Sequence, residues 1–229
     1  MKAKRNETAI LIGWAGKIFP AMIELLGEKG IEAINMDGDM LNRLDESHAA
    51  LFTNGRNIRY IVYSALLEKD MYPSKITALS VQDWKAWKHH VYNRLFNVNR
   101  FLVEKMLPKG EGHFLVVGAI TGVIPSNGEE LSGAASASAF MIMKSMAAEL
   151  AAEGLTASAV ALGVLEEGTG AVTLDNTEKT RSHIPSGKPL SAWDAAEGIV
   201  KQLIESPCQW NGNVIRMDSG FSCSYMREW

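Results

Sequence analysis

Cysteine is scarce in this chain. Its 229 residues include only two, Cys208 and Cys223, and these do not form a Cys-x-x-Cys pair. A disulfide framework needs several paired cysteines, and a cysteine-based zinc site needs clustered thiols. The cysteine content therefore excludes both and agrees with the reducing environment of the cytosol.

A charge excess and a long apolar run are missing too. The net charge of −3 provides no electrostatic basis for binding nucleic acid or an acidic membrane surface. No window approaches the ~18 consecutive apolar residues of a membrane span. The opening "MKAKRNETAILIG" is charged, but its apolar part is too short for a signal peptide and has no small-residue cleavage site. We expect a cytoplasmic protein that binds neither nucleic acid nor membrane.

Several catalytic and metal-binding motifs are absent as well. The sequence contains no Gly-x-Ser-x-Gly, no His-Glu-x-x-His and no phosphate loop of the P-loop type. His89 and His90 are adjacent, so on a helix they point about 100° apart and cannot share a metal ion. The other histidines, His48, His113 and His183, are scattered along the chain. We therefore expect no metal site.

What the sequence does contain is a regular alternation of strand-length apolar runs and helix-length segments. The predicted strands cover residues 9–13, 31–36, 58–66, 113–119, 155–163 and 213–217. The predicted helices cover 20–29, 39–52, 81–106, 131–152 and 192–206, and 164–186 is irregular. The methionines Met141, Met143 and Met146 and most of the six tryptophans are expected in the core. This alternation predicts one α/β domain over 1–229, with a three-layer, doubly wound parallel sheet of the Rossmann type.

Several segments, taken in order, resemble the short-chain dehydrogenase/reductase family over nearly the whole chain. The stretch "IGWAGKIFPAMIELLGEKG" aligns with the family's opening glycine-rich loop and helix, and "VVGAITG" with the strand that ends in a catalytic serine. The stretch "SGAASASAFMIMKSMAAEL" matches the helix that carries the family's Tyr-x-x-x-Lys motif, and "NVIRMDSG" ends in a variant of its Asp-Gly-Gly turn. The resemblance implies a Rossmann-type fold and an oxidoreductase ancestry.

The residues that would carry the family's chemistry are replaced. In the family, a tyrosine is the general acid/base, a lysine one helical turn later lowers its pKa, and an upstream serine polarises the carbonyl. The matching positions hold Ser132, Ser136 and Ala119, with the family's spacing intact. A serine hydroxyl does not titrate near neutral pH, so it cannot replace the tyrosine. The family's helix asparagine corresponds to either Asn93 or Leu95, and we expect no catalytic residue in this chain.

The opening loop is altered as deeply. A dinucleotide-binding loop needs glycines so that its backbone can approach the pyrophosphate. Gly13 keeps the first of the family's three glycines, whereas the second and third positions hold Lys17 and Phe19. Pro20 has no amide hydrogen to offer a phosphate, and Phe19 is expected to occupy the pyrophosphate space. Only Lys17 could still attract an anion, so we expect no cofactor in this chain.

The region that would surround the adenine is shortened. The stretch between Asp37 and the strand at 58–66 is roughly 20 residues shorter than the family usually has, which predicts that one strand–helix pair is missing. Asp37 stands where an NAD enzyme holds its ribose-binding carboxylate, but a turn or helix-cap role is equally open. The family's Asn-Asn-Ala-Gly is replaced here by residues 63–66, "YSAL".

Contacts between subunits are a further implication of the resemblance. Family members commonly form tetramers that pair two long helices, and also the last helix and strand, across subunits. The corresponding segments here are 81–106, 132–152 and 192–229. The small residues of the second segment allow close helix approach, either to a neighbouring subunit or to this chain's own sheet. The tail that contains Tyr225, Met226 and Trp229 is expected to lie in a contact between chains.

These losses predict an inactive member of the family. The favoured interpretation is a non-catalytic structural or regulatory subunit of a heterotetramer, whose active paralogue binds NAD. The alternative is a stand-alone pseudoenzyme that binds a small anionic ligand through Lys17. A third interpretation places new chemistry on Ser132, Ser136 or a histidine, and it ranks last because no base is spaced to activate a serine.

Overall fold

The structure is a computed structural model of the whole chain, and it describes residues 7–36, 40, 45–67, 76–166, 177–205 and 207–225. Ile76, His90, Lys179 and Tyr225 are described by their backbone alone. Asp37 and residues 226–229 lie outside the described residues, so the predictions that concern them are carried forward untested.

The described strands form one parallel sheet. They are β1 (Glu7–Ile12), β2 (Glu32–Met36), β3 (Asn57–Ser64), β4 (Gly112–Ala119), β5 (Leu155–Leu162) and β6 (Val214–Met217). Their order across the sheet is β2-β1-β3-β4-β5-β6, and every neighbouring pair is parallel. This order confirms the predicted doubly wound sheet of the Rossmann type.

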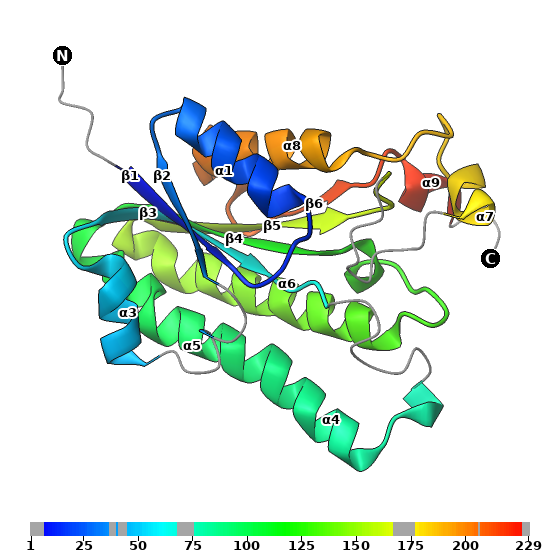
Figure 1. Cartoon of the computed structure of the whole chain (residues 1–229), viewed down its shortest axis with the longest axis horizontal. Coiled ribbons are helices and arrows are strands. Elements are labelled where there is room, and N and C mark those ends of the chain that lie inside the picture. The colour runs from blue at the N-terminus through cyan, green and yellow to red at the C-terminus, as the bar shows by residue number, and fades with distance from the viewer. Residues whose placement is uncertain are drawn as a thin grey trace.

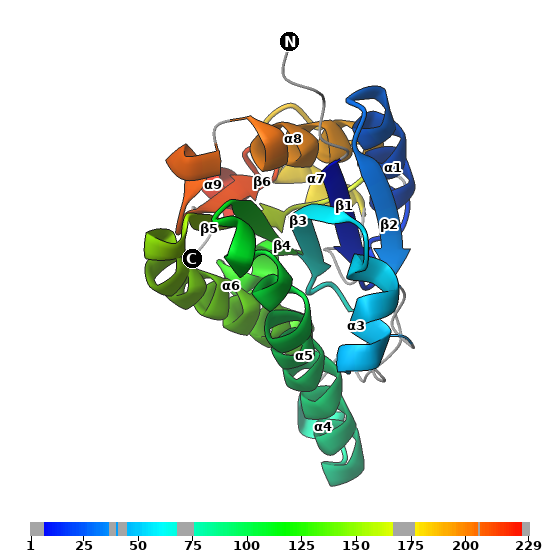
Figure 2. The same cartoon turned by 90° about the vertical axis from the view of Figure 1, so that its left-hand side faces the viewer.

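Helices cover both faces of the sheet and complete the three layers (Figure 1). One face carries α1 (Ile18–Glu28) and α8 (Ala192–Ile204). The other face carries α3 (Glu46–Thr53), α5 (Arg94–Phe101) and α6 (Glu130–Leu150). The helix α4 (Val81–Lys88) continues the line of α5 and projects away from the sheet (Figure 2). Across the described residues, no helix combines the length and apolar character needed to pass through a bilayer.

The core is divided by the sheet into two apolar clusters. Successive residues of a strand point to opposite faces of the sheet. In the middle of β4 the residues on both faces are apolar. Leu115 and Val117 belong to the cluster under α1 and α8, whereas Phe114 and Val116 belong to the cluster under α5 and α6. Both faces of the strand are therefore buried, as a parallel sheet with helices on both sides requires.

The sheet has β2 at one edge among the described strands. In the common Rossmann order a third strand lies outside the second one. Here the described part of the connection between β2 and β3 holds α3 and a helical Met40, and residues 37–39 and 41–44 are not described. The predicted loss of one strand–helix pair is compatible with this connection and stays a prediction.

The long helix predicted at 81–106 is interrupted. A π-helical turn, His89–Asn93, separates α4 from α5, and the α-helix ends at Phe101 before short 3-10 turns. A π turn holds one more residue than an α turn and so rotates the faces that follow it. Trp87 before this turn, Val91 within it and Leu95 after it are all buried.

Two expectations about the core are only partly right. Met143 and Met146 are buried as predicted, but Met141 is exposed because it lies on the outer side of α6. Of the five described tryptophans only Trp87 is fully buried, with Trp84 stacked on it at a ring-centroid distance of 4.9 Å. The prediction that most tryptophans are core residues is therefore wrong for the described part of the chain.

Two short helices were not predicted. The helix α7 (Glu178–Ser182) lies within the segment expected to be irregular, and the Thr177 side chain caps it by accepting the Thr180 N–H. The helix α9 (Phe221–Tyr225) follows β6, and the Asp218 carboxylate accepts N–H donors from Gly220 and Ser222 at 3.0 Å each. Both helices depend on a cap of one side chain, and helices of this length leave no periodic pattern to find.

Candidate functional site

The carboxyl ends of β1, β3, β4 and β5 meet at one edge of the sheet, where ligands bind in this class of fold. Gly13, directly after β1, has a φ of +91° and donates its N–H to the Met36 carbonyl at 3.0 Å. A Cβ at this position would lie 3.2 Å from the Ser64 carbonyl oxygen. Gly13 therefore has a structural role: without a side chain, it allows the ends of β1, β2 and β3 to lie close together.

The start of α1 offers few donors to a phosphate. Anions bind at helix N-termini through free backbone N–H groups. The Ile18 N–H is already donated to the Ala15 carbonyl at 3.0 Å, and Pro20 has none. Of the first three residues of α1, all of which are described, this leaves Phe19 with an available N–H. Lys17 precedes the helix and its side chain is exposed.

Apolar side chains occupy the space beside this loop. Phe19 is 2% exposed and Leu66 is 4% exposed, and they belong to the same buried cluster as Ala15, Ala119 and Leu165. Phe19 lies in the first turn of α1, and the others come from the loops after β1, β3 and β5 and from the end of β4. A pyrophosphate carries charge that apolar walls cannot solvate, so the residues present do not fit the phosphates of a dinucleotide. The absence of cofactor binding itself stays a prediction.

The three positions of the lost catalytic residues are close together. Ala119 ends β4, and its N–H donates to the Ser136 Oγ of α6 at 2.9 Å. Ser132 lies one turn earlier on the same helix, and all three residues are buried. None of the three side chains is an acid or base near neutral pH. The fold therefore brings these three positions together without a proton-transfer group at any of them.

Tight packing surrounds Ser136. A Cβ added at Gly118 would lie 2.7 Å from the Phe140 ring, and one added at Gly122 would lie 2.6 Å from the Ser136 Cβ. On the next turn, a Cβ at Gly133 would lie 2.8 Å from the Thr121 carbonyl oxygen. The helix α6 thus rests directly on β4 and the turn after it. A lysine at position 136 would need space that these contacts already occupy.

Neither candidate for the family's helix asparagine offers an amide to this site. The Asn93 side chain is exposed, and its Nδ2 lies 2.9 Å from His89 Nδ1 on the helix surface. Leu95 is buried in the core and is apolar. The structure therefore brings Ala119, Ser132 and Ser136 together, but it leaves Asn93 outside.

Sequence reasoning missed a buried polar network at the opposite end of the strands. His113 on β4 places Nδ1 2.7 Å from Thr156 Oγ1 and Nε2 2.8 Å from Ser158 Oγ. Gln202 of α8 donates to the same Ser158 Oγ at 2.8 Å. Burial disfavours the charged imidazolium and lowers the pKa of His113 to about 4. Thr156 and Ser158 are two residues apart on a predicted strand and so lie on the same face. This polar pair could have indicated the network from the sequence.

His48 and His183 have local structural roles. His48 contacts the Asp45 carboxylate at 2.9 Å at the start of α3, where hydrogen bonds lower the pKa of Asp45. His183 packs edge-on against Phe221 with ring centroids 5.9 Å apart. In the part of the chain that the structure describes, no three His, Cys, Asp or Glu residues gather in a way that could hold a metal ion.

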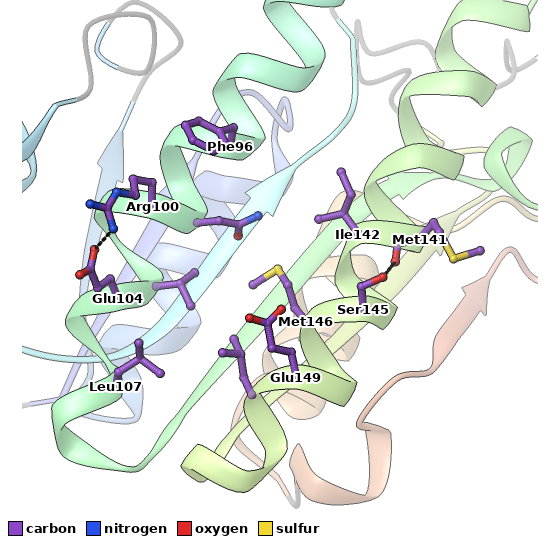
Figure 3. Close-up of a pocket in the computed structure, with 12 residues that line it drawn as sticks. Phe96, Arg100, Glu104, Leu107, Met141, Ile142, Ser145, Met146 and Glu149 are labelled. Atoms are coloured by element: carbon purple, nitrogen blue, oxygen red, sulfur yellow. Dashed lines mark hydrogen bonds and ion pairs between the residues drawn. The ribbon is translucent and has the colours of Figure 1, made fainter.

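A second feature is a groove between α5 and α6, with a volume of about 570 Å³ (Figure 3). Apolar side chains dominate its lining: Phe96, Val103, Leu107, Met141, Ile142, Met146 and Leu150. Phe96 is 65% exposed and Met141 is 62% exposed. Contiguous exposed apolar surface is typical of sites where proteins interact. The groove lies on the two helices that the sequence indicated as contacts between subunits.

Known proteins share this architecture. A 3-oxoacyl-[acyl-carrier-protein] reductase from Vibrio cholerae is 23% identical over 239 residues, covering 94% of this chain and 97% of that protein. The crystal structure of a short chain dehydrogenase from Bacillus anthracis superposes with a TM-score of 0.81 at 18% identity, covering 96% of this chain and 98% of the other. A 3-ketoacyl-(acyl-carrier-protein) reductase from Brucella melitensis, complexed with NADH, gives a TM-score of 0.72 at 15% identity, covering 94% and 98%.

The family model described as short chain dehydrogenase matches residues 3–179, which is more than half of the chain. The matched stretch includes the altered loop, β4 and the whole of α6. The chain therefore belongs to the short-chain dehydrogenase/reductase family.

Proposed function

We propose that this chain is a non-catalytic subunit of a hetero-oligomeric short-chain dehydrogenase, in which an active paralogue binds NAD and transfers the hydride. The observation that carries the proposal is the apolar cluster around Phe19 and Leu66, on the edge of the sheet where the cofactor would lie. It occurs together with Ser132, Ser136 and Ala119 at the catalytic positions. A fold that is retained while both its cofactor seat and its proton-transfer groups are replaced serves another protein.

The pattern of lost motifs resembles one dehydrogenase in particular. In 2-[hydroxy(phenyl)methyl]succinyl-CoA dehydrogenase of anaerobic toluene degradation, a degenerate chain pairs with a competent one. We propose an assembly of this kind for the present chain, with NAD in the partner subunit and none here. Its role there is structural or regulatory support of the partner's site.

The exposed groove supports a subunit role. Apolar area left in water costs free energy, about 25 cal/mol per Å², and a neighbouring helix pair would cover Phe96 and Met141. The tail at 225–229, proposed as a second contact, lies outside the described residues except for the backbone of Tyr225.

Titration calorimetry of the isolated chain with NADH and with NADPH tests the proposal. We expect no measurable binding, because the loop offers apolar walls and few N–H donors to the phosphates. A short-chain dehydrogenase with an intact loop, titrated under the same conditions, is the control. Micromolar binding at this chain's own crevice would refute the proposal.

A second candidate function is a stand-alone pseudoenzyme that binds a small anion. The exposed Lys17 directly before α1 favours it, since a cation there would add to the positive end of the helix dipole. The probe is inorganic phosphate followed by NMR of the backbone amides of residues 15–19. Shifts that saturate and disappear in Lys17→Ala would support this function, and unchanged spectra would contradict it.

A further inference from the structure

The positive and negative charges in the lining of the α5–α6 groove do not cancel. On the α5 side, Arg100 Nη1 lies 3.2 Å from Glu104 Oε2, so this wall carries an ion pair (Figure 3). On the α6 side stands Glu149, for which the described residues provide no hydrogen-bond or ion-pair partner. The groove lining therefore holds one arginine and two glutamates, and its net charge is negative.

The charge of the lining disfavours a second copy of this chain as the occupant. A symmetric pair places identical surfaces against each other. Two grooves would then bring together two arginines and four glutamates, which leaves two carboxylates uncompensated. Removing such charges from water is unfavourable, and like charges at an interface suppress the wrong partner.

We propose that the groove holds a helix of a different subunit, whose facing side has an apolar stripe and a lysine or arginine opposite Glu149. The space between two neighbouring helices matches a third helix in shape. This inference rests on the proposed subunit function and deepens it, because it names the chemistry that selects a foreign subunit over a second copy. Glu149 is the residue that makes the selection.

Mixing wild-type chain with the Glu149→Lys variant tests the inference. The variant supplies the same apolar surface with a cation in place of the Glu149 carboxylate, so the mixed pair has a lining with no net charge. Sedimentation equilibrium with fluorophore-labelled wild-type chain measures each dissociation constant. We expect the mixed pair to associate at least about tenfold more tightly than wild-type chain with itself, and added salt to reduce the difference.

The control is Glu24→Lys, which changes the net charge equally but lies on the exposed side of α1, across the sheet. It is expected to leave association with wild-type chain unchanged. Equal association of wild-type chain with itself and with Glu149→Lys would overturn the inference, as would no association in any mixture. The measurement involves neither cofactor nor turnover, so it can fail while the calorimetric result stands, and the converse also holds.

Discussion

At the scale of single residues, His113 places a titratable ring inside the protein between two hydroxyl groups. The hydroxyls of Thr156 and Ser158 can accept hydrogen bonds from either ring nitrogen, but neither carries a negative charge. Protonation would therefore bury an uncompensated cation. Gln202 and the two hydroxyls hold the neutral ring in place at the start of the sheet.

This arrangement predicts acid sensitivity. The pKa of His113 is about 4 in the folded chain, against an ordinary histidine value of 6.5. Between these values the unfolded chain binds more protons, so the stabilisation is complete above pH 6.5 and is lost as the pH falls toward 4. The loss is up to about 3 kcal/mol. Urea unfolding across this pH range measures it.

The matched variants are His113→Gln and His48→Gln. A glutamine side chain cannot titrate, so the part of the pH dependence due to the buried imidazole should disappear in the first variant. His48 is exposed, and its replacement should leave most of the dependence in place. If His113→Gln keeps the full slope of the wild-type chain, the buried imidazole is not its source.

The catalytic positions lead to a second prediction at this scale. The double variant Ser132→Tyr, Ser136→Lys restores the family's pair, yet we expect no nicotinamide-dependent turnover because the buried apolar side chains of Phe19 and Leu66 remain beside the loop that would hold the phosphates. We also expect a lower free energy of unfolding, by about 2–4 kcal/mol, because an unpaired ammonium replaces a buried serine. Absorbance assays and urea unfolding are the measurements.

Ala134→Lys, on the exposed side of α6, controls for the stability effect of a new lysine. It should unfold nearly as the wild-type chain does. Turnover by the double variant above the wild-type background would show that the crevice still accepts a cofactor, and the proposal of a non-catalytic subunit would lose its main support.

At the scale of the element, α6 is distinguished by how closely its backbone approaches the sheet. Alanine, serine and glycine dominate its first half, and Gly133 faces the turn after β4. The sequence analysis left open whether these small residues meet a neighbouring subunit or this chain's own sheet. For Gly133 the structure answers the question, since Thr121 of the same chain is the contact.

Two helical glycines should respond in opposite directions to the same substitution. Gly27→Ala in α1 meets no atom within 4 Å and should raise the free energy of unfolding by about 0.5–1 kcal/mol through helix propensity. Gly133→Ala would place its Cβ 2.8 Å from a backbone oxygen and should lower it by about 1–3 kcal/mol. Urea unfolding of both variants decides the matter, and a stabilised Gly133→Ala would show that α6 can shift outward at little cost.

At the scale of the whole molecule, four of the exposed apolar residues lie on α4, α5, α6 and the π turn between α4 and α5. The helices α4 and α5 and the π turn between them carry Trp84, Tyr92 and Phe96, and α6 contributes Met141 beside Phe96 in the groove. Trp87 stacks under Trp84 and meets Tyr92 edge-on, with ring centroids 5.8 Å apart. A rigid aromatic surface of this kind favours association because little side-chain entropy is lost on binding.

Replacement of one groove residue should therefore weaken assembly without unfolding the chain. We expect Met141→Asp to reduce recovery of an active paralogue in co-purification by about tenfold or more, because a carboxylate would be buried against the partner. Leu51→Asp is the matched control, since Leu51 is 72% exposed on α3 and does not line the groove. Co-expression, size exclusion and the partner's activity are measured together. Equal recovery with both variants would remove the groove from the interface.

The sequence by itself determined the class of fold and the identity of the replaced residues. Each strand is a local apolar run between breakers, and the order of runs and helices specifies a parallel doubly wound sheet. The family spacing was enough to locate Ala119, Ser132 and Ser136, which the structure brings together. Element ends moved by a few residues, because caps and 3-10 turns depend on contacts that a pattern does not contain.

Only the tertiary structure decided which side of each element is covered. It placed Phe19 and Leu66 in one cluster, turned Asn93 outward at a π turn, and left Met141 exposed. It also joined His113 to two hydroxyls on the next strand and put Glu149 into one groove with Arg100 and Glu104. The physical reason is the same in each case: burial and pairing depend on residues distant in the chain, and local periodicity does not specify which of them meet.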